Sequence, residues 1–444
     1  MIKLNLKHKK DCVQNSVNKL LTYLFLILIL SSCSFIGKEQ AKKDQSEPNI
    51  KEIFRTINPI KEELNAGLPI YLKNFTKGNP FINNLSNNTG NIDFETNFEN
   101  KKKYSFANIK EFNFIQPELI FINDGSLISF DGKGNFFKID DKFKLAWKTN
   151  HYSKKEKRLS PVVYFAQIEN RLLAADTLSN IFCVDINNGE LLWTKKGQSP
   201  FNSNIKVFKN RFMVVDYENV IRAFSSKDGK ELWKFETENS FIKSQKKMSL
   251  VIKGEVLYFI NALGDVTALN IEDGSLLWQT PTQSNIIYQN AFSLENSDII
   301  YANNAIYFSN NKNEFFSIDS RSGVVKWKQT INSSLRPTVI KNYVITVSQE
   351  GFLFVIEENT GNVLRISNTF INVKNKNNEI KPVGFLIAKN KIYLSLNNGR
   401  IIKIDLKSGV QENIFKLHGS KISRPYIHDG NMYLIKDNAI SKIR

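Results

Sequence analysis

The sequence predicts an all-β fold, an eight-bladed β-propeller of four-stranded antiparallel blades, from three observations. A turn followed by a tryptophan recurs along the 444-residue chain. The segments around this device repeat every ~40–50 residues, the usual spacing of propeller blades. Each repeat contains short apolar runs bounded by Gly, Asn and Asp, a pattern typical of strands joined by tight turns.

The first element along the chain is predicted to be a leader. Residues 1–19 carry five lysines and one aspartate, residues 20–30 are mostly apolar, and "SSC" follows. A basic region, a short apolar run and small residues are typical of a secretory signal, and the run is too short to span a bilayer. The stretch "LSSC" (30–33) resembles a bacterial lipobox. We therefore expect residues 1–32 to be removed and Cys33 to be acylated, for example with palmitate; an uncleaved anchor or a plain signal is the alternative.

Residues 33–90 are predicted to form a lipidated flexible tether and N-terminal segment. Residues 34–58 are polar and without periodicity, and "NNLSNNTGN" (83–91) has the composition of a loop. Two or more acyl chains on one residue would hold the protein firmly to a bilayer. The propeller is then expected to occupy residues 91–444.

The repeats are best aligned on their third strands. Each third strand ends at a polar residue, at Asp140, Asp185, Ser225, Asn270, Asp319, Glu357, Asp405 and Arg444. The eighth unit stops there, so its fourth strand is missing. Because an open blade would expose unpaired backbone groups, we expect a strand within residues 91–106 to complete it and close the ring.

The turn between the third and fourth strands explains the recurring device, as in "IEDGSLLWQT" (271–280). Gly adopts positive φ at little cost, which allows the chain to reverse. The Trp that follows lies on the outer strand, where its ring can cover the gap between adjacent blades. Units six and seven carry Arg365 and Asn413 instead, which predicts weaker junctions. The predicted blade-docking residues, for which a row of ligand-stacking rings is the alternative, are Trp147, Trp193, Trp233, Trp278 and Trp327.

"ALNIEDGSLLW" (268–278) and its siblings resemble the repeat shared by pyrroloquinoline-quinone dehydrogenases and the BamB lipoproteins of the outer-membrane β-barrel assembly machinery. The lipobox, the eight units and the incomplete last unit resemble the BamB family specifically. The resemblance implies a non-enzymatic scaffold, lipid-anchored at the periplasmic face of the outer membrane. It would bind the periplasmic domains of the central barrel subunit, as a monomeric member of a hetero-complex.

The resemblance also indicates a partner-binding loop between units three and four, "ENSFIKSQKKMS" (238–249). The leucine- and arginine-bearing motif of that family's loop is not reproduced here. The predicted contact residues are Phe241, Ile242, Lys243, Lys246 and Lys247. A solvated basic loop is the alternative.

Little in the sequence predicts reactive chemistry. The net charge is +18, but no arginine-rich helix or basic stripe with interleaved aromatics indicates nucleic-acid binding. No histidine lies at metal-ligand spacing, and no phosphate-binding loop or nucleophile motif appears. After processing Cys183 would be the one unmodified cysteine, predicted to be a buried strand residue. We expect no catalytic residue, metal or cofactor; a quinone-dependent dehydrogenase and a periplasmic ligand-binding propeller are the alternatives.

Overall fold

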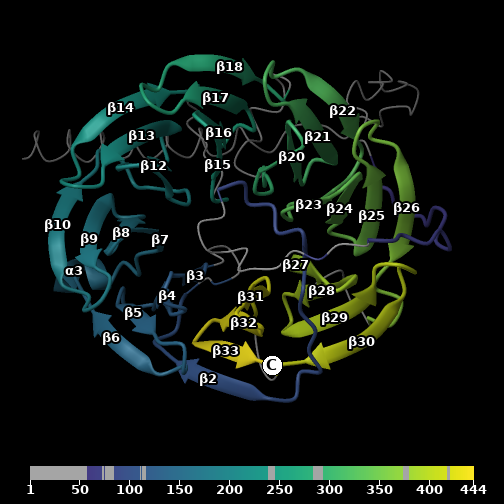
Figure 1. Ribbon diagram of the computed structural model, residues 1–444, viewed down its shortest axis with the longest axis horizontal. Coiled ribbons are helices and arrows are strands. Elements are labelled where there is room, and N and C mark those ends of the chain that lie inside the picture. Colours follow the sequence, from purple (N-terminus) through teal and green to yellow (C-terminus); the bar gives the residue numbers. More distant parts are fainter. Residues whose placement is uncertain are drawn as a thin grey trace, which may run out of the picture. The chain divides into compact units, whose positions relative to one another are not determined.

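The computed structural model describes residues 58–72, 75, 85–110, 112, 117–238, 246–283, 294–373, 380–417 and 421–444. The chain divides at residues 56 and 57, and all described residues belong to the second unit. Within this unit, eight sheets follow one another around a ring (Figure 1). The predicted eight-bladed propeller is confirmed.

The blades are antiparallel sheets whose strands run in chain order from the centre of the ring outwards (Figure 1). The first four blades comprise β3 (Ile120–Phe121), β4 (Leu127–Phe130), β5 (Phe136–Ile139) and β6 (Leu145–Thr149); β7 (Val163–Ile168), β8 (Arg171–Asp176), β9 (Asn180–Asp185) and β10 (Leu191–Lys196); β11 (Lys206–Phe208), β12 (Arg211–Val215), β13 (Val220–Ser225) and β14 (Glu231–Glu236); and β15 (Ser249–Lys253), β16 (Val256–Ile260), β17 (Val266–Asn270) and β18 (Leu276–Thr280).

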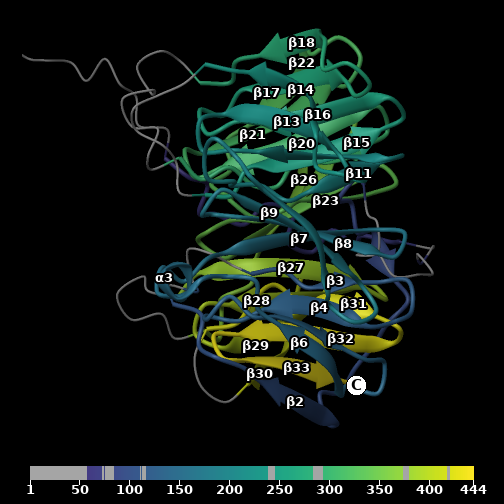
Figure 2. The same ribbon diagram turned by 90° about the vertical axis from the view of Figure 1, so that its left-hand side faces the viewer.

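The last four blades follow the same pattern. They comprise β19 (Ile300–Ala302), β20 (Ala305–Asn310), β21 (Glu314–Asp319) and β22 (Val325–Gln329); β23 (Thr338–Ile340), β24 (Tyr343–Val347), β25 (Phe352–Glu357) and β26 (Val363–Asn368); β27 (Pro382–Ala388), β28 (Lys391–Leu396), β29 (Arg400–Asp405) and β30 (Gln411–Lys416); and β31 (Tyr426–His428), β32 (Asn431–Lys436) and β33 (Ala439–Ile443). A short helix, α3 (Lys154–Lys157), lies at one face of the ring (Figure 2).

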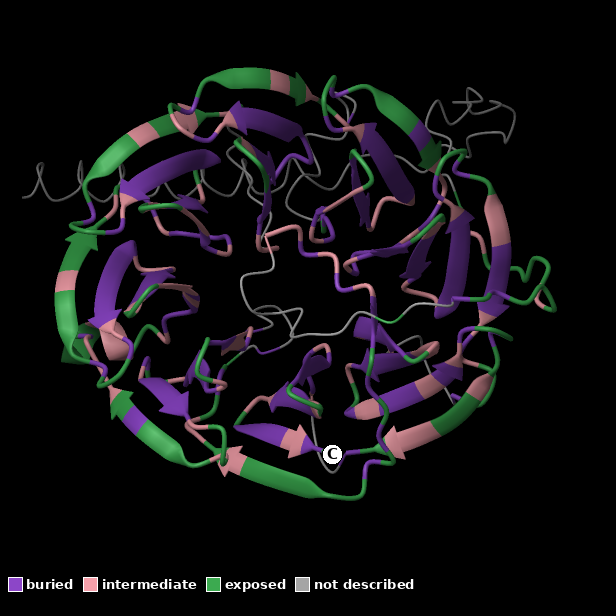
Figure 3. Ribbon diagram, viewed as in Figure 1, coloured by how far each residue is buried: buried purple, intermediate pink, exposed green. Residues whose placement is uncertain are grey.

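Burial follows the position of a strand in its blade. The second and third strands are almost wholly buried, and the outermost strands are largely exposed (Figure 3). This is expected because the middle strands have a neighbouring blade on each face, whereas the outer strand borders solvent. Cys183, on the third strand of blade 2, is fully buried as predicted, and burial raises the pKa of its thiol to about 11.

The N-terminal part of the chain closes the ring. Strand β2 (Lys101–Ser105) pairs antiparallel with β33 and supplies the outer strand that blade 8 lacks. The predicted closure is therefore confirmed, and Lys101–Ser105 is the strand responsible. On the next blade, the ring of Phe137 lies 5.3 Å from that of Tyr104, so the same strand also contacts blade 1.

The residues just before β2 connect the inner strands of four successive blades. The carbonyl of Leu85 accepts from Ile252 of blade 4, and that of Ser86 accepts from Tyr301 of blade 5. The side chain of Asn88 exchanges two 3.0 Å hydrogen bonds with the backbone of Val339 in blade 6. Strand β1 (Asn91–Ile92) then pairs in parallel with β27 of blade 7. Residues 85–92 thus form a strap across the centre of the ring (Figure 1).

Each tryptophan of the repeat lies against the turn glycine of the next blade. An added Cβ at Gly274 would come within 2.5 Å of the Trp233 ring, and the indole N–H of Trp233 donates to the carbonyl of Ile271 at 3.2 Å. The rings therefore contribute packing across blade junctions and leave no room for a side chain in the turn. The other four pairs are Trp147 with Gly189, Trp193 with Gly229, Trp278 with Gly323, and Trp327 with Gly361.

The junction between blades 6 and 7, expected to be weak for want of a tryptophan, is held by Arg365. This side chain is fully buried and donates to the carbonyls of Leu406 (2.7 Å), Lys407 (2.8 Å) and Leu68 (2.9 Å). Leu406 follows the third strand as Ile271 does in blade 4, so the guanidinium takes over the hydrogen bond of the indole. Leu68 comes from residues 58–72, which were assigned to the tether segment and here pack on the blades.

Replacing Arg365 by Met should destabilise this junction, because the three hydrogen bonds of the buried guanidinium would be lost and the carbonyls of Leu406 and Leu68 would lose this donor. We expect a loss of about 2 kcal/mol, measured as a shift of the urea midpoint of the full chain. Arg321→Met, at an exposed turn of blade 5, is the matched control and should change the midpoint little. A shift no larger than that of the control would contradict the role assigned to Arg365.

Candidate functional site

The predicted partner-binding residues fall in two groups. Phe241, Ile242 and Lys243 lie outside the described residues, as does Cys33. Lys246 and Lys247 are described and lie just before β15, the innermost strand of blade 4. The structure brings these two lysines into a polar cluster at the centre of the ring, and the binding role of their loop stays a prediction.

The cluster is built from one position of the repeat. In six blades the residue two places before the innermost strand is polar, and the side chains from blades far apart around the ring meet at its centre. Two are carboxylates, three are cations and one is an amide. They are Glu118, Asn204, Lys247, Asp298, Arg336 and Arg424.

A serine fixes the backbone of this position in blades 3, 5 and 8. Its hydroxyl accepts from an N–H of the second strand and donates to the carbonyl of the polar residue that follows it. Both bonds are local to the blade, so the polar side chain is free to point toward the centre. The serines are Ser203, Ser297 and Ser423.

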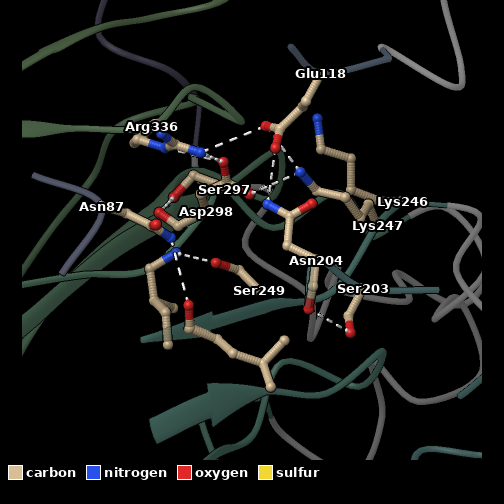
Figure 4. Close-up of polar contacts among 12 residues, drawn as sticks. Asn87, Glu118, Ser203, Asn204, Lys246, Lys247, Ser249, Ser297, Asp298 and Arg336 are labelled. Carbon is tan, nitrogen blue, oxygen red and sulfur yellow. Dashed lines mark hydrogen bonds and ion pairs between the residues drawn. The ribbon is translucent and has the colours of Figure 1, made fainter. Parts of the chain in front are cut away.

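Glu118 is the most connected member. Its Oε1 lies 2.9 Å from Nη2 of Arg424. The same oxygen lies 3.0 Å from Nζ of Lys247, and Oε2 accepts from Asn204 at 2.9 Å (Figure 4). Arg336 bridges the two carboxylates: its Nη2 lies 3.6 Å from Glu118, and its Nε donates to Asp298 at 2.9 Å. Residues from blades 1, 3, 4, 5, 6 and 8 therefore form one continuous network.

The electrostatics of the network favour ionised carboxylates. Burial disfavours the charge on Glu118, but Lys247, Arg424 and Arg336 overcome this effect and lower its pKa to about 2. The pKa of Asp298 is also well below its usual value, because Arg336 and Lys247 outweigh its burial. Both groups carry full negative charge at neutral pH.

Two further lysines add positive charge beside the network. Lys206, the first residue of β11, is buried and donates to Oδ1 of Asn87 on the strap at 2.6 Å. Burial and the nearby charge of Arg336 lower its pKa to about 7. Burial likewise lowers the pKa of Lys246. We call the seven ionisable residues the hub cluster: Glu118, Lys206, Lys246, Lys247, Asp298, Arg336 and Arg424.

The hub cluster brings side chains of both charges within ion-pairing distance of one another. Within the described ranges, no group of three or more His, Cys, Asp and Glu side chains could hold a metal ion. In the same part of the chain, no helix has the length and apolar character to cross a bilayer. Lys246 and Lys247 were predicted from the sequence as contact residues, but the other five members were missed because the members differ in type. The available signal was a serine before a polar residue at the start of a unit, as in "SN", "SD" and "SR".

Comparison with known proteins places this architecture in context. A family model described as outer membrane protein assembly factor BamB matches residues 139–367. The BamB of Legionella pneumophila (strain Paris) is 23% identical over 159 residues, which are 35% of this chain and 36% of that protein. The chain thus spans little more than a third of the length of this curated relative.

Two longer similarities cover most of the chain. An uncharacterized protein of Rickettsia conorii is 23% identical over 457 residues, covering 88% of this chain and 99% of the relative. The crystal structure of BamB from Moraxella catarrhalis matches with a TM-score of 0.60 at 12% identity, covering 78% of this chain and 97% of that structure. At this identity the structural likeness establishes the fold alone.

Proposed function

The chain belongs to the family of the outer membrane protein assembly factor BamB, and from this premise we propose that it is a non-catalytic scaffold of the outer-membrane β-barrel assembly machinery. The observation that carries the proposal is the family match, which covers residues 139–367. The scaffold would bind the periplasmic domains of the central assembly subunit and hold them near the membrane. Its rigid ring suits this task, because a preorganised surface loses little entropy on binding.

The exposed rim of the propeller supports a binding role. In blades 1 to 5 apolar side chains that face solvent lie at or next to the start of the outer strand, although polar side chains occupy many of its other positions. Exposed apolar residues that recur on adjacent blades are a common feature of interaction surfaces. They are Leu145, Leu191, Leu192, Leu232, Leu276, Leu277, Val324 and Val325.

The partner is tested by photo-crosslinking in cells. A photoreactive residue at position 243, in the predicted loop, should give an adduct with the central assembly subunit. The same residue at position 410, an exposed site on blade 7, is the matched control and should not. Absence of any assembly subunit from the adducts at 243 and from a pull-down of solubilised outer membrane would overturn the proposal.

Anchoring is tested separately through Cys33. The variant Cys33→Ala should lose labelling with radioactive palmitate and move from the membrane to the soluble periplasmic fraction. Cys12→Ala, a cysteine of the predicted leader, is the matched control and should leave both readouts unchanged. Membrane retention of an unlabelled Cys33→Ala protein would refute the lipid anchor.

A scaffold should also show no quinone-dependent activity. Incubation of the purified protein with pyrroloquinoline quinone and calcium should give no new absorbance band and no dye reduction. Dye reduction that depends on the quinone would favour an enzyme on this propeller.

A further inference from the structure

Residues 58–72 are fixed to the rim of the propeller at blades 6 and 7. Leu64 and Ile366 of β26 exchange two backbone hydrogen bonds, at 3.2 and 2.8 Å. Farther along the chain, the N–H of Ile70 donates to the carbonyl of Lys407 in blade 7 at 3.0 Å. Because β26 is the outermost strand of its blade, the segment lies on the outside of blade 6 (Figure 1).

The side chains of this segment divide between the core and the surface. Ile70 and Leu72 are each 2% exposed and belong to the core between blades 6 and 7. Tyr71, the residue between them, faces away from the blades. Outward positions of a segment that borders water are usually polar, but here four large apolar side chains within twelve residues are exposed by 40% to 58%. We call these four residues the N-terminal patch: Leu64, Leu68, Tyr71 and Phe75.

The repeat does not account for the N-terminal patch. The exposed apolar residues of the outer strands recur near one position of successive units, next to the tryptophan that joins the blades. The patch lies outside these units, and every blade has its four strands without it. Single exposed apolar residues are ordinary, but several in one short segment that is held in place are typical of a surface that contacts another apolar phase.

The part of the chain before residue 58 indicates what covers the patch. Cys33, the predicted lipid anchor, is separated from residue 58 by 24 residues. A flexible linker of that length has a root-mean-square span of ~27 Å, so an anchored chain holds the patch close to the bilayer. Tyr and Phe suit the boundary between headgroups and acyl chains. Nζ of Lys407 lies 4.9 Å from the centre of the Tyr71 ring, and a cation beside an apolar side chain suits lipid phosphate groups.

We propose that the N-terminal patch lies against the surface of the bilayer that holds the acyl chains of Cys33. This contact would orient the ring, with the rim of blade 6 toward the lipid. Blade 2, on the opposite side of the ring, would face away from the lipid (Figure 1). The exposed apolar residues of blade 2 would then be open to a protein partner. The inference rests on the lipid anchor of the proposed function but not on the assembly role.

The test is fluorescence quenching in the full chain, purified with its anchor and bound to vesicles of phosphatidylcholine and phosphatidylglycerol that carry a nitroxide near the headgroup. Tyr71→Cys introduces an exposed thiol for a dye, whereas Cys183 is buried. The vesicle-bound chain is collected by flotation. We expect the dye at position 71 to lose about half of its fluorescence, because an interfacial segment buries its apolar side chains ~5–10 Å deep.

Leu192→Cys is the matched control, because Leu192 is an exposed apolar residue on the outer strand of blade 2. A dye at position 192 should lose little fluorescence. The unaltered chain, treated with dye in parallel, reports any labelling of the native cysteines. Quenching at position 192 that equals or exceeds quenching at position 71 would overturn the inference, and so would a dye at position 71 that the nitroxide lipid leaves unquenched.

The outcomes distinguish the patch from the anchor and from the assembly role. An unquenched dye at position 71 on a chain that carries palmitate would overturn the lipid contact alone, and a protein or a second copy of the chain would then be the cover of the patch. A quenched dye on a chain without palmitate would refute the anchor and keep the lipid contact. A chain that does not float with the vesicles would overturn both. A missing adduct from position 243 bears on the assembly role only.

Discussion

Replacing Glu118 by Gln is expected to destabilise the propeller by about 3 kcal/mol at neutral pH. The substitution keeps the size of the side chain but removes the charge that Lys247, Arg424 and Arg336 share. Breaking a buried ion pair by removing one partner leaves uncompensated charge, which typically costs about 3–5 kcal/mol. The measurement is the free energy of unfolding in urea, followed by circular dichroism.

The pH dependence of this effect has a defined sign. The pKa of Glu118 is about 2 in the folded chain and near 4.5 when unfolded. A carboxyl group with a lowered pKa stabilises the fold above its unfolded value, and that contribution is lost as the pH falls toward the folded value. The difference in stability between the unaltered chain and Glu118→Gln should therefore be constant above pH 5 and shrink between pH 4.5 and pH 2.

The control for Glu118→Gln is Glu190→Gln. Glu190 lies in the exposed turn between β9 and β10, so the same chemical change there should alter stability by less than about 0.5 kcal/mol. Equal effects of the two substitutions, or a difference that does not shrink in acid, would contradict the role of Glu118.

The fold could be predicted because equivalent positions in successive units carry residues of the same kind. Third strands end at comparable polar residues, and Trp follows a turn Gly in four units. The missing strand of the last unit implied a donor, and Lys101–Ser105 supplies it. These features are local, so each unit displays them in its own sequence.

The hub could not be predicted in the same way, because its residues have one position in common but not one chemistry. Lys246 and Lys247 were predicted to contact a partner, with a solvated basic loop as the alternative. The ring turns Lys247 toward Glu118 and Asp298, whose positions in the sequence lie 129 residues before it and 51 after it. The stability of the junction at Arg365 was also underestimated, because the carbonyls to which Arg365 donates come from another blade and from residues 58–72.

The second large effect is expected at a blade junction, in Gly274→Ala. Gly274 has φ +75°, and an added Cβ would come within 2.5 Å of the Trp233 ring. The positive φ costs an L-residue about 1 kcal/mol, and forcing a methyl group into a packed interface costs about 1–3 kcal/mol more. We therefore expect a loss of about 2–4 kcal/mol in the free energy of unfolding.

Gly254→Ala separates the two causes of this loss. Gly254 also has positive φ, +61°, but no atom lies within 4 Å of an added Cβ. Gly254→Ala should lose only the backbone contribution of about 1 kcal/mol.

A second variant, Trp233→Leu, removes the ring that the methyl group would contact, so Gly274→Ala should cost less in that background than in the unaltered chain. If Gly274→Ala costs no more than Gly254→Ala, or if its cost is the same with and without the indole ring, the tryptophans do not hold the blades together through the turn glycines.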